Sequence, residues 1–113
     1  MDRKIQAYGS YYEDFFNSLD SGSRQKVLYG MLLLKTIDRL PSKFVKYIGS
    51  GVYELRIEWQ GNIFRIFFCF DACNLIILFN GFKKKSQDTP RAEIEKAIRL
   101  KNEYYARKED ENV

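Results

Sequence analysis

The feature that most constrains this chain is an alternation of apolar and charged residues near its middle. Between Tyr53 and Trp59, apolar side chains alternate with Glu54, Arg56 and Glu58. A period of two is typical of a β-strand that is buried on one face and polar on the other. The sequence therefore predicts a strand here, with its charged side chains together on one face.

Two further strand-like runs follow directly. Residues 63–70 form an aromatic and β-branched run that is typical of a central strand, and residues 75–82 form a second apolar run. The turn-forming residues 60–62 and 71–74 separate the three runs. We therefore expect a three-stranded antiparallel meander over residues 53–82, with Phe64, Ile66, Phe68 and Phe70 on one face and Arg65 with Asn80 on the other.

The short loops fix which residues face each other. A loop of two or four residues after the first strand places Arg56 opposite Arg65, with Glu54 diagonal to Arg65. The same geometry at the second turn places Asn80 opposite Arg65 on its other side. Like charges directly opposed across strands are destabilising, so the two arginines indicate a bound anion such as phosphate. The alternative is that Glu54 and Glu58 neutralise the arginines on a solvated face.

Length and composition predict one folded domain, residues 1–113. The chain is 45% hydrophobic, which excludes a disordered tail, and its net charge of +4 favours a polyanionic partner. It contains no histidine, the commonest general base and the usual metal ligand. With no run of 18 apolar residues and no signal-peptide core in MDRKIQAY, we expect a cytoplasmic protein without a membrane segment.

The two cysteines offer neither a disulfide nor a zinc site. Cys69 falls in the middle of a predicted strand and Cys73 in a turn, so a structural disulfide between them is not expected. Two thiolates without histidine are too few for structural zinc. We expect Cys69 to be a buried strand residue.

The segment before the meander predicts a strand and two helices. Arg3 to Tyr8 alternates weakly, and Ser10 with Glu13 is a capping-box pattern that begins a helix. A second helix is expected from about Ser23 to Leu40, ending at Pro41. Its apolar residues are expected to be buried. They are Val27, Leu28, Met31, Leu32 and Leu34.

Residues 41–51 are expected to form a loop, and a last helix follows the meander. The loop interleaves basic Lys43 and Lys46 with Phe44 and Tyr47, a pattern that suits RNA, although the aromatics are equally suited to packing under the sheet. Thr89 followed by proline predicts the N-cap of a helix from Pro90 to about Arg107. The expected fold class is α+β: two N-terminal helices on a small, mostly antiparallel sheet in the order β-α-α-β-β-β, plus a C-terminal helix.

Four blocks in order carry a resemblance. They are YELRI at 53–57, GNIFRIFFCF at 61–70, NGFKKK at 80–85, and TPRAEIEKA at 89–97 with EYY at 103–105. Over these residues the chain resembles the HigB/RelE-type toxins, in their phage-derived Gp49-like branch. The resemblance implies a RelE-like fold and the toxin of a bacterial toxin–antitoxin pair, with a cognate helix-turn-helix antitoxin as partner.

The resemblance also implies a chemistry. Such toxins cleave mRNA in the ribosomal A site without metal or cofactor, through attack of the 2′-hydroxyl on the adjacent phosphate. The matching catalytic candidates are Glu54 as proton acceptor, with Arg56, Arg65 and Lys84 as charge stabilisers. The RNA-binding candidates are Lys43, Lys46, Lys83 and Lys85. A terminal tyrosine or histidine is often used in these enzymes, and here Tyr104 or Tyr105 would have to replace it from a helix.

Two other classes of function stay open. The same basic residues would serve a non-catalytic module that binds RNA or the ribosome, because binding and catalysis draw on the same charges. A phage-encoded inhibitor of a host protein is a third class. The lysines at 83–85 also fit a solvated charge run that keeps a sheet edge soluble.

Overall fold

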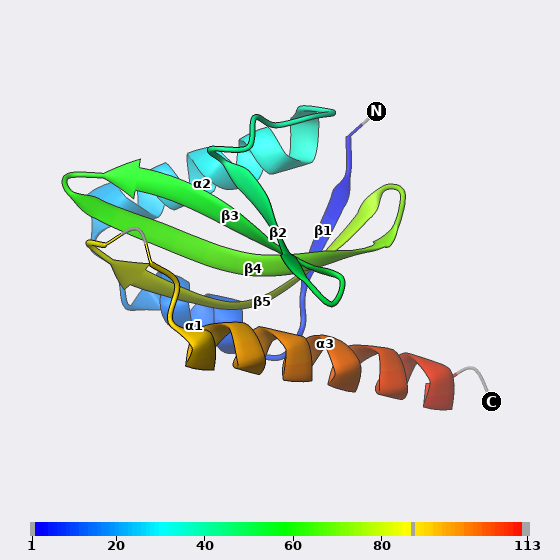
Figure 1. The fold of residues 1–113 in the computed structure, drawn as a ribbon. Helices are drawn as coiled ribbons and strands as arrows, with labels where there is room; N and C mark the ends of the chain where they lie inside the picture. Colours follow the sequence, from blue (N-terminus) through cyan, green and yellow to red (C-terminus); the bar gives the residue numbers. More distant parts are fainter. Residues whose placement is uncertain (1, 87, 112–113) are drawn as a thin grey trace.

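The computed structural model describes residues 2–86 and 88–111, which form one mixed sheet with helices on both faces (Figure 1). The elements, in chain order, are β1 (Lys4–Ala7), α1 (Tyr11–Asn17), α2 (Ser21–Thr36), β2 (Val45–Gly49), β3 (Val52–Trp59), β4 (Asn62–Ala72), β5 (Leu75–Lys84) and α3 (Arg91–Glu111). The strand order is β1-β5-β4-β3-β2, with β1 parallel to β5 and the other pairs antiparallel. The predicted α+β class is confirmed.

The predicted register of the first hairpin is also confirmed. β3 and β4 are joined by the two residues Gln60 and Gly61, whose φ angles of 51° and 78° are those of the tight turn that matches strand twist. Arg56 therefore lies directly opposite Arg65. Because cross-strand partners point to the same face, both arginines lie on one side of the sheet.

The predicted register of the second hairpin is wrong. Phe82, and not Asn80, lies opposite Arg65, because the turn consists of Cys73 and Asn74 and begins two residues later than the expected turn at residues 71–74. Irregularities then shift the pairing at two places along β4 and β5. Bulges of this kind have no clear sequence signal in an apolar run, so the pattern alone missed them.

The two N-terminal helices depart from the sequence prediction at their ends. Ser10 makes no side-chain cap of α1, and its hydroxyl contacts Asp14 instead, whereas Asp20 caps α2 by accepting from the Ser23 amide. α2 ends at Thr36 and not at Leu40. The helix ends early because of a tertiary contact: the Arg3 guanidinium donates hydrogen bonds to backbone carbonyl groups at this end of α2. These are the carbonyls of Leu34, Ile37 and Asp38.

The expected loop at residues 41–51 contains a strand, β2, that the sequence analysis missed. β2 pairs antiparallel with β3, and Val45 lies opposite Leu55 at the edge of the core. The residues around Val45 are mostly basic and aromatic, so the apolar pattern was too short to predict a strand there. Pairing with β3 stabilises the strand, although its local sequence has little preference for one.

Each face of the sheet has its own apolar core. α1 and α2 cover one face, where Phe64, Ile66 and Phe68 are fully buried and Phe70 packs beside them, as predicted. α3 covers the other face, where it buries Ala97 and Leu100 against the sheet. Cys69 is buried on the α3 side and Cys73 is exposed, both as free thiols. None of the helices in the described residues is long and apolar enough to cross a membrane.

Two further predictions about helices are wrong. Leu28 and Leu32 were expected in the core but are 53% and 54% exposed, because α2 turns its Val27–Gly30–Leu34 stripe to the sheet instead. α3 begins at Arg91, and Thr89 does not cap it through its hydroxyl, which is engaged elsewhere.

Candidate nucleic-acid interface

The centre of the candidate site is Glu54, whose carboxylate lies between the two arginines of the first hairpin. Its Oε1 is 2.9 Å from Nε of Arg56 and 3.7 Å from Nε of Arg65. Glu54 and Arg65 are fully buried, while the Arg56 side chain keeps 19% of its surface exposed. We call these three residues the Glu54 cluster. Glu54 neutralises part of the arginine charge, as the alternative interpretation expected, but it does so as a buried side chain and not on a solvated face. The cluster keeps a net charge of +1.

Contacts from the segment after β5 hold this cluster in place. Thr89 donates its hydroxyl to Glu54 Oε2 at 2.8 Å, and Arg65 Nη2 donates to the Ser86 carbonyl at 3.0 Å. The Phe82 ring lies 5.6 Å from the Arg65 guanidinium carbon. Burial lowers the pKa of Arg65, and the charge of Glu54 opposes this effect.

Sequence reasoning did not find the roles of Ser86 and Thr89. Thr89 lies 35 residues from Glu54 along the chain, and Ser86 lies 21 residues from Arg65. Polar residues in a loop carry no local signal for contacts at such separations. Only the return of the chain across the sheet toward α3, which Figure 1 shows, brings them to the arginines.

Two further cations share the face of the Glu54 cluster. Lys46 lies opposite Glu54 in the β2–β3 pairing and is exposed. Lys84 follows Phe82 by two residues on β5, so strand alternation turns it to the same face, where it is half-buried. We call this set the basic face. It consists of Lys46, Arg56, Arg65 and Lys84, from four adjacent strands.

The structure does not bring the other predicted lysines to this face. Lys83 is turned to the opposite side of the sheet and lines a hollow beside α1. Lys43 lies before β2, with its ammonium over the Phe44 ring. Lys85 lines a polar hollow of about 400 Å³ at the β3–β4 turn, together with Glu58 and Asn62.

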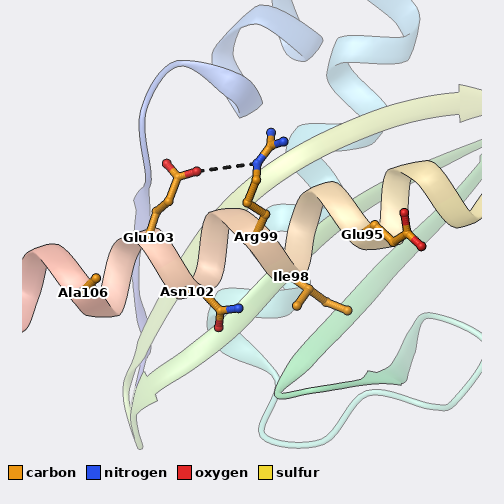
Figure 2. Close-up of a pocket in the computed structure, with 6 residues that line it drawn as sticks. All are labelled: Glu95, Ile98, Arg99, Asn102, Glu103 and Ala106. Carbon is orange, nitrogen blue, oxygen red and sulfur yellow. Dashed lines mark ion pairs between the residues drawn. The ribbon is translucent and has the colours of Figure 1, made fainter.

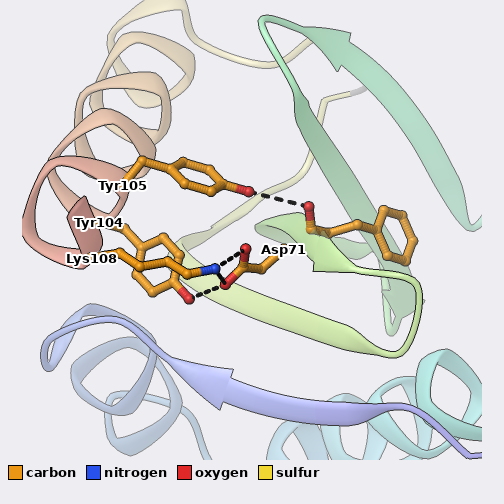
Figure 3. A network of polar contacts seen from close by, with 5 residues as sticks. Asp71, Tyr104, Tyr105 and Lys108 are labelled. Carbon is orange, nitrogen blue, oxygen red and sulfur yellow. Dashed lines mark hydrogen bonds and ion pairs between the residues drawn. The ribbon is translucent and has the colours of Figure 1, made fainter. Parts of the chain in front are cut away.

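The tyrosines near the C-terminus serve the attachment of α3. Tyr104 donates to Asp71 at 2.5 Å and Lys108 contacts the same carboxylate at 2.7 Å, while Tyr105 donates to the Phe70 carbonyl. Figure 3 shows this network. Lys108 and Tyr104 lower the pKa of Asp71 by donating to it, and burial raises the pKa of Tyr105 to about 12. Asp71 is six residues from Arg65 along β4, or about 20 Å. Neither tyrosine reaches the Glu54 cluster.

Another hollow, on the outer surface of α3, does not form a site. It measures about 510 Å³ and is lined by Glu95, Ile98, Arg99, Asn102, Glu103 and Ala106 (Figure 2). Arg99 pairs with Glu103 one turn away, and both side chains are largely exposed, so this is a solvated helix face. Among residues 2–86 and 88–111, no three histidine, cysteine or acidic side chains are grouped to hold a metal ion.

The fold defines the class of protein. It matches a chain of the archaeal RelE–RelB complex from Pyrococcus horikoshii with a TM-score of 0.53, over 78% of this chain and 100% of that one, at 11% sequence identity. The architecture is therefore RelE-like.

The sequence defines the family more closely. Residues 14–102 match the family described as phage-derived Gp49-like proteins, and the chain belongs to that family. The resemblance drawn from the four sequence blocks is thereby confirmed. A comparison with curated proteins found no match.

Proposed function

We propose that this chain is the toxin of a type II toxin–antitoxin pair that cleaves mRNA on the ribosome and so inhibits translation. Membership of the Gp49-like family and the RelE-like fold support the toxin role. The solved structure of similar fold is a complex of RelE with RelB, which supports a cognate antitoxin as the partner of this chain.

The basic face is the observation that supports RNA cleavage by this protein. In the proposed cleavage the 2′-hydroxyl loses its proton and its oxygen bonds to the adjacent phosphorus, which forms a 2′,3′-cyclic phosphate. The bond from phosphorus to the 5′-oxygen breaks, and that oxygen takes up a proton. Negative charge accumulates on the phosphorus oxygens in the transition state, and fixed cations stabilise it without a cofactor. Arg56 and Arg65 share one carboxylate, so the cluster retains positive charge for a phosphate.

The burial of each residue suggests its role in cleavage. Arg56 is partly exposed and has a guanidinium fork that fits two phosphate oxygens, so we place it in contact with the scissile phosphate. Lys84 would add a second charge, and Lys46 and Lys85 would bind flanking phosphates. Glu54 and Arg65 are fully buried, and we propose that they position Arg56. Both Glu54 oxygens already contact other side chains, Arg56 and Thr89. We therefore prefer the positioning of Arg56 as the role of Glu54 over the proton-acceptor role expected from the resemblance.

One observation favours a second candidate, a non-catalytic protein that binds RNA or the ribosome. No tyrosine at the C-terminus reaches the Glu54 cluster, and Arg65 is inaccessible to solvent. Binding needs only the exposed Lys46 and the partly exposed Arg56, whereas cleavage also needs groups that move protons.

Expression in a bacterial host separates the candidates. A toxin should arrest growth, and co-expression of the product of the adjacent reading frame should restore it. Mapping of RNA ends during the arrest should then show cleavage within translated messages, with cyclic phosphate ends. Growth arrest with intact messages would favour the binding protein, and normal growth with a folded product would contradict the toxin.

A further inference from the structure

The outer surface of α2 exposes more apolar surface than a solvated helix needs. Leu28, Tyr29 and Leu32 are 53%, 58% and 54% exposed, and they adjoin one another over one helical turn. We call these three residues the α2 patch. Scattered apolar side chains are ordinary on a protein surface, whereas adjacent ones on a single helix mark an interaction site.

The α2 patch is bordered by a hollow on each side. Leu28 and Leu32 form one wall of a hollow of about 400 Å³, whose opposite wall comes from Ile5 and Ala7 of β1. Tyr29 lines a second hollow of about 140 Å³ between α2 and β3, where Phe44 and Leu55 also lie. The apolar surface therefore continues from the edge strand β1 across α2 to β3.

The close seating of α2 on the sheet makes this surface rigid. At Gly30, next to Tyr29, an added Cβ would lie 2.3 Å from Cδ1 of Ile57. The helix therefore approaches β3 as closely as its backbone allows, and the exposed side chains are presented from a fixed platform. A preformed surface reduces the entropy lost when a partner binds.

The charges around the α2 patch are mainly positive. Lys35 lines the larger hollow, and Lys26 lines the smaller one together with Glu58. Over residues 21–43 the basic residues outnumber the single acidic one. They are Arg24, Lys26, Lys35, Arg39 and Lys43, against Asp38. A second copy of this chain would bring like-charged borders together, whereas an acidic segment would find opposite charges.

We infer that the α2 patch is the docking surface for an acidic segment of the antitoxin whose large apolar side chains fill the two hollows. This inference rests on the proposed function, because it takes the partner from the toxin–antitoxin assignment. It adds a location: α2 covers the opposite face of the sheet from the basic face, so docking and cleavage depend on different residues.

The test uses the full chain and the product of the adjacent reading frame as the probe. The double variant Leu28→Glu, Leu32→Glu places two carboxylates in the patch at positions that are already more than half exposed. Tyr47→Glu is the matched control, since Tyr47 is 57% exposed on β2, outside the patch. The dissociation constant should rise about 100-fold or more in the double variant and change less than about 3-fold in the control.

Charge reversal and self-association complete the test. Lys35→Glu should slow association and flatten its salt dependence. Messenger cleavage by the free double variant should equal that of the parent. Parental affinity in the double variant would overturn the inference, as would a homodimer of the parent that the double variant abolishes. A parent that arrests growth yet does not bind the probe would overturn the inference and leave the cleavage activity standing, whereas a parent without toxicity would refute the proposed function itself.

Discussion

Glu54 and Arg65 are buried together on adjacent strands, with Glu54 Oε1 3.7 Å from Arg65 Nε and neither side chain open to solvent. The same Glu54 oxygen lies 2.9 Å from Arg56, which does reach solvent. The pair therefore links a buried charge to the surface residue that we place at the phosphate. The arrangement makes the site sensitive to changes that never touch RNA.

Replacing Glu54 by Gln should destabilise the protein by about 3 kcal/mol or more, because Arg65 would remain buried without its counter-charge. The change keeps the side-chain volume, so packing is preserved. Urea unfolding monitored by tryptophan fluorescence measures the loss. Glu95→Gln is the control: Glu95 is 66% exposed and paired with Arg91, and its loss should cost less than about 0.5 kcal/mol. Equal stability of the two variants would show that Arg65 does not depend on Glu54.

Lys46 and Lys83 should differ in their effect on RNA binding, although both are exposed strand lysines. Lys46 is on the basic face and Lys83 on the opposite side of the sheet. Lys46→Ala should weaken binding to a short RNA and reduce the slope of log affinity against log salt by about one unit. Lys83→Ala should change neither. A larger effect from Lys83 would mean that RNA binds on the α1 side.

The Asp71 network should make stability depend on pH. The pKa of Asp71 is lowered from its usual 3.8, so its contribution is complete above that value and is lost as the pH falls through the lower folded pKa. Replacing Asp71 by Asn should cost about 2 kcal/mol at neutral pH. The difference between the two proteins should shrink as the pH falls below 3.8 and through the lower folded pKa. A difference that stays constant with pH would assign the loss to packing.

Tyr104→Phe should leave cleavage unchanged. The hydroxyl binds Asp71, about 20 Å along β4 from Arg65, and its loss should cost about 1 kcal/mol of stability. Cleavage assays at a temperature where both proteins are folded would separate the two effects. A large fall in the cleavage rate of the folded variant would show that Tyr104 does act in the catalytic site.

The sequence predicted the parts of this fold that depend on local pattern. The meander, the opposition of Arg56 and Arg65, and the burial of Phe64, Ile66 and Phe68 follow from alternation and from a two-residue turn. Family and fold followed from the four sequence blocks.

What the sequence did not predict depends on tertiary contacts. The end of α2 is set by Arg3, β2 exists because β3 pairs with it, and the position of the second turn places Phe82 where Asn80 was expected. The same holds for Leu28 and Leu32. Their spacing is that of a buried stripe, and only the close approach of Gly30 to Ile57 decides which side of α2 faces the sheet.

The most direct test of the account is single-turnover cleavage of mRNA on programmed ribosomes, at saturating protein, for the parent, Arg56→Ala and Lys83→Ala. Arg56→Ala should slow the cleavage step by about 100-fold or more, as expected for the loss of one fixed charge-stabilising group. Its affinity for the ribosome should change much less, and Lys83→Ala should cleave at the parental rate. If the folded Arg56→Ala protein also cleaves at the parental rate once saturated, the basic face is not the site of cleavage.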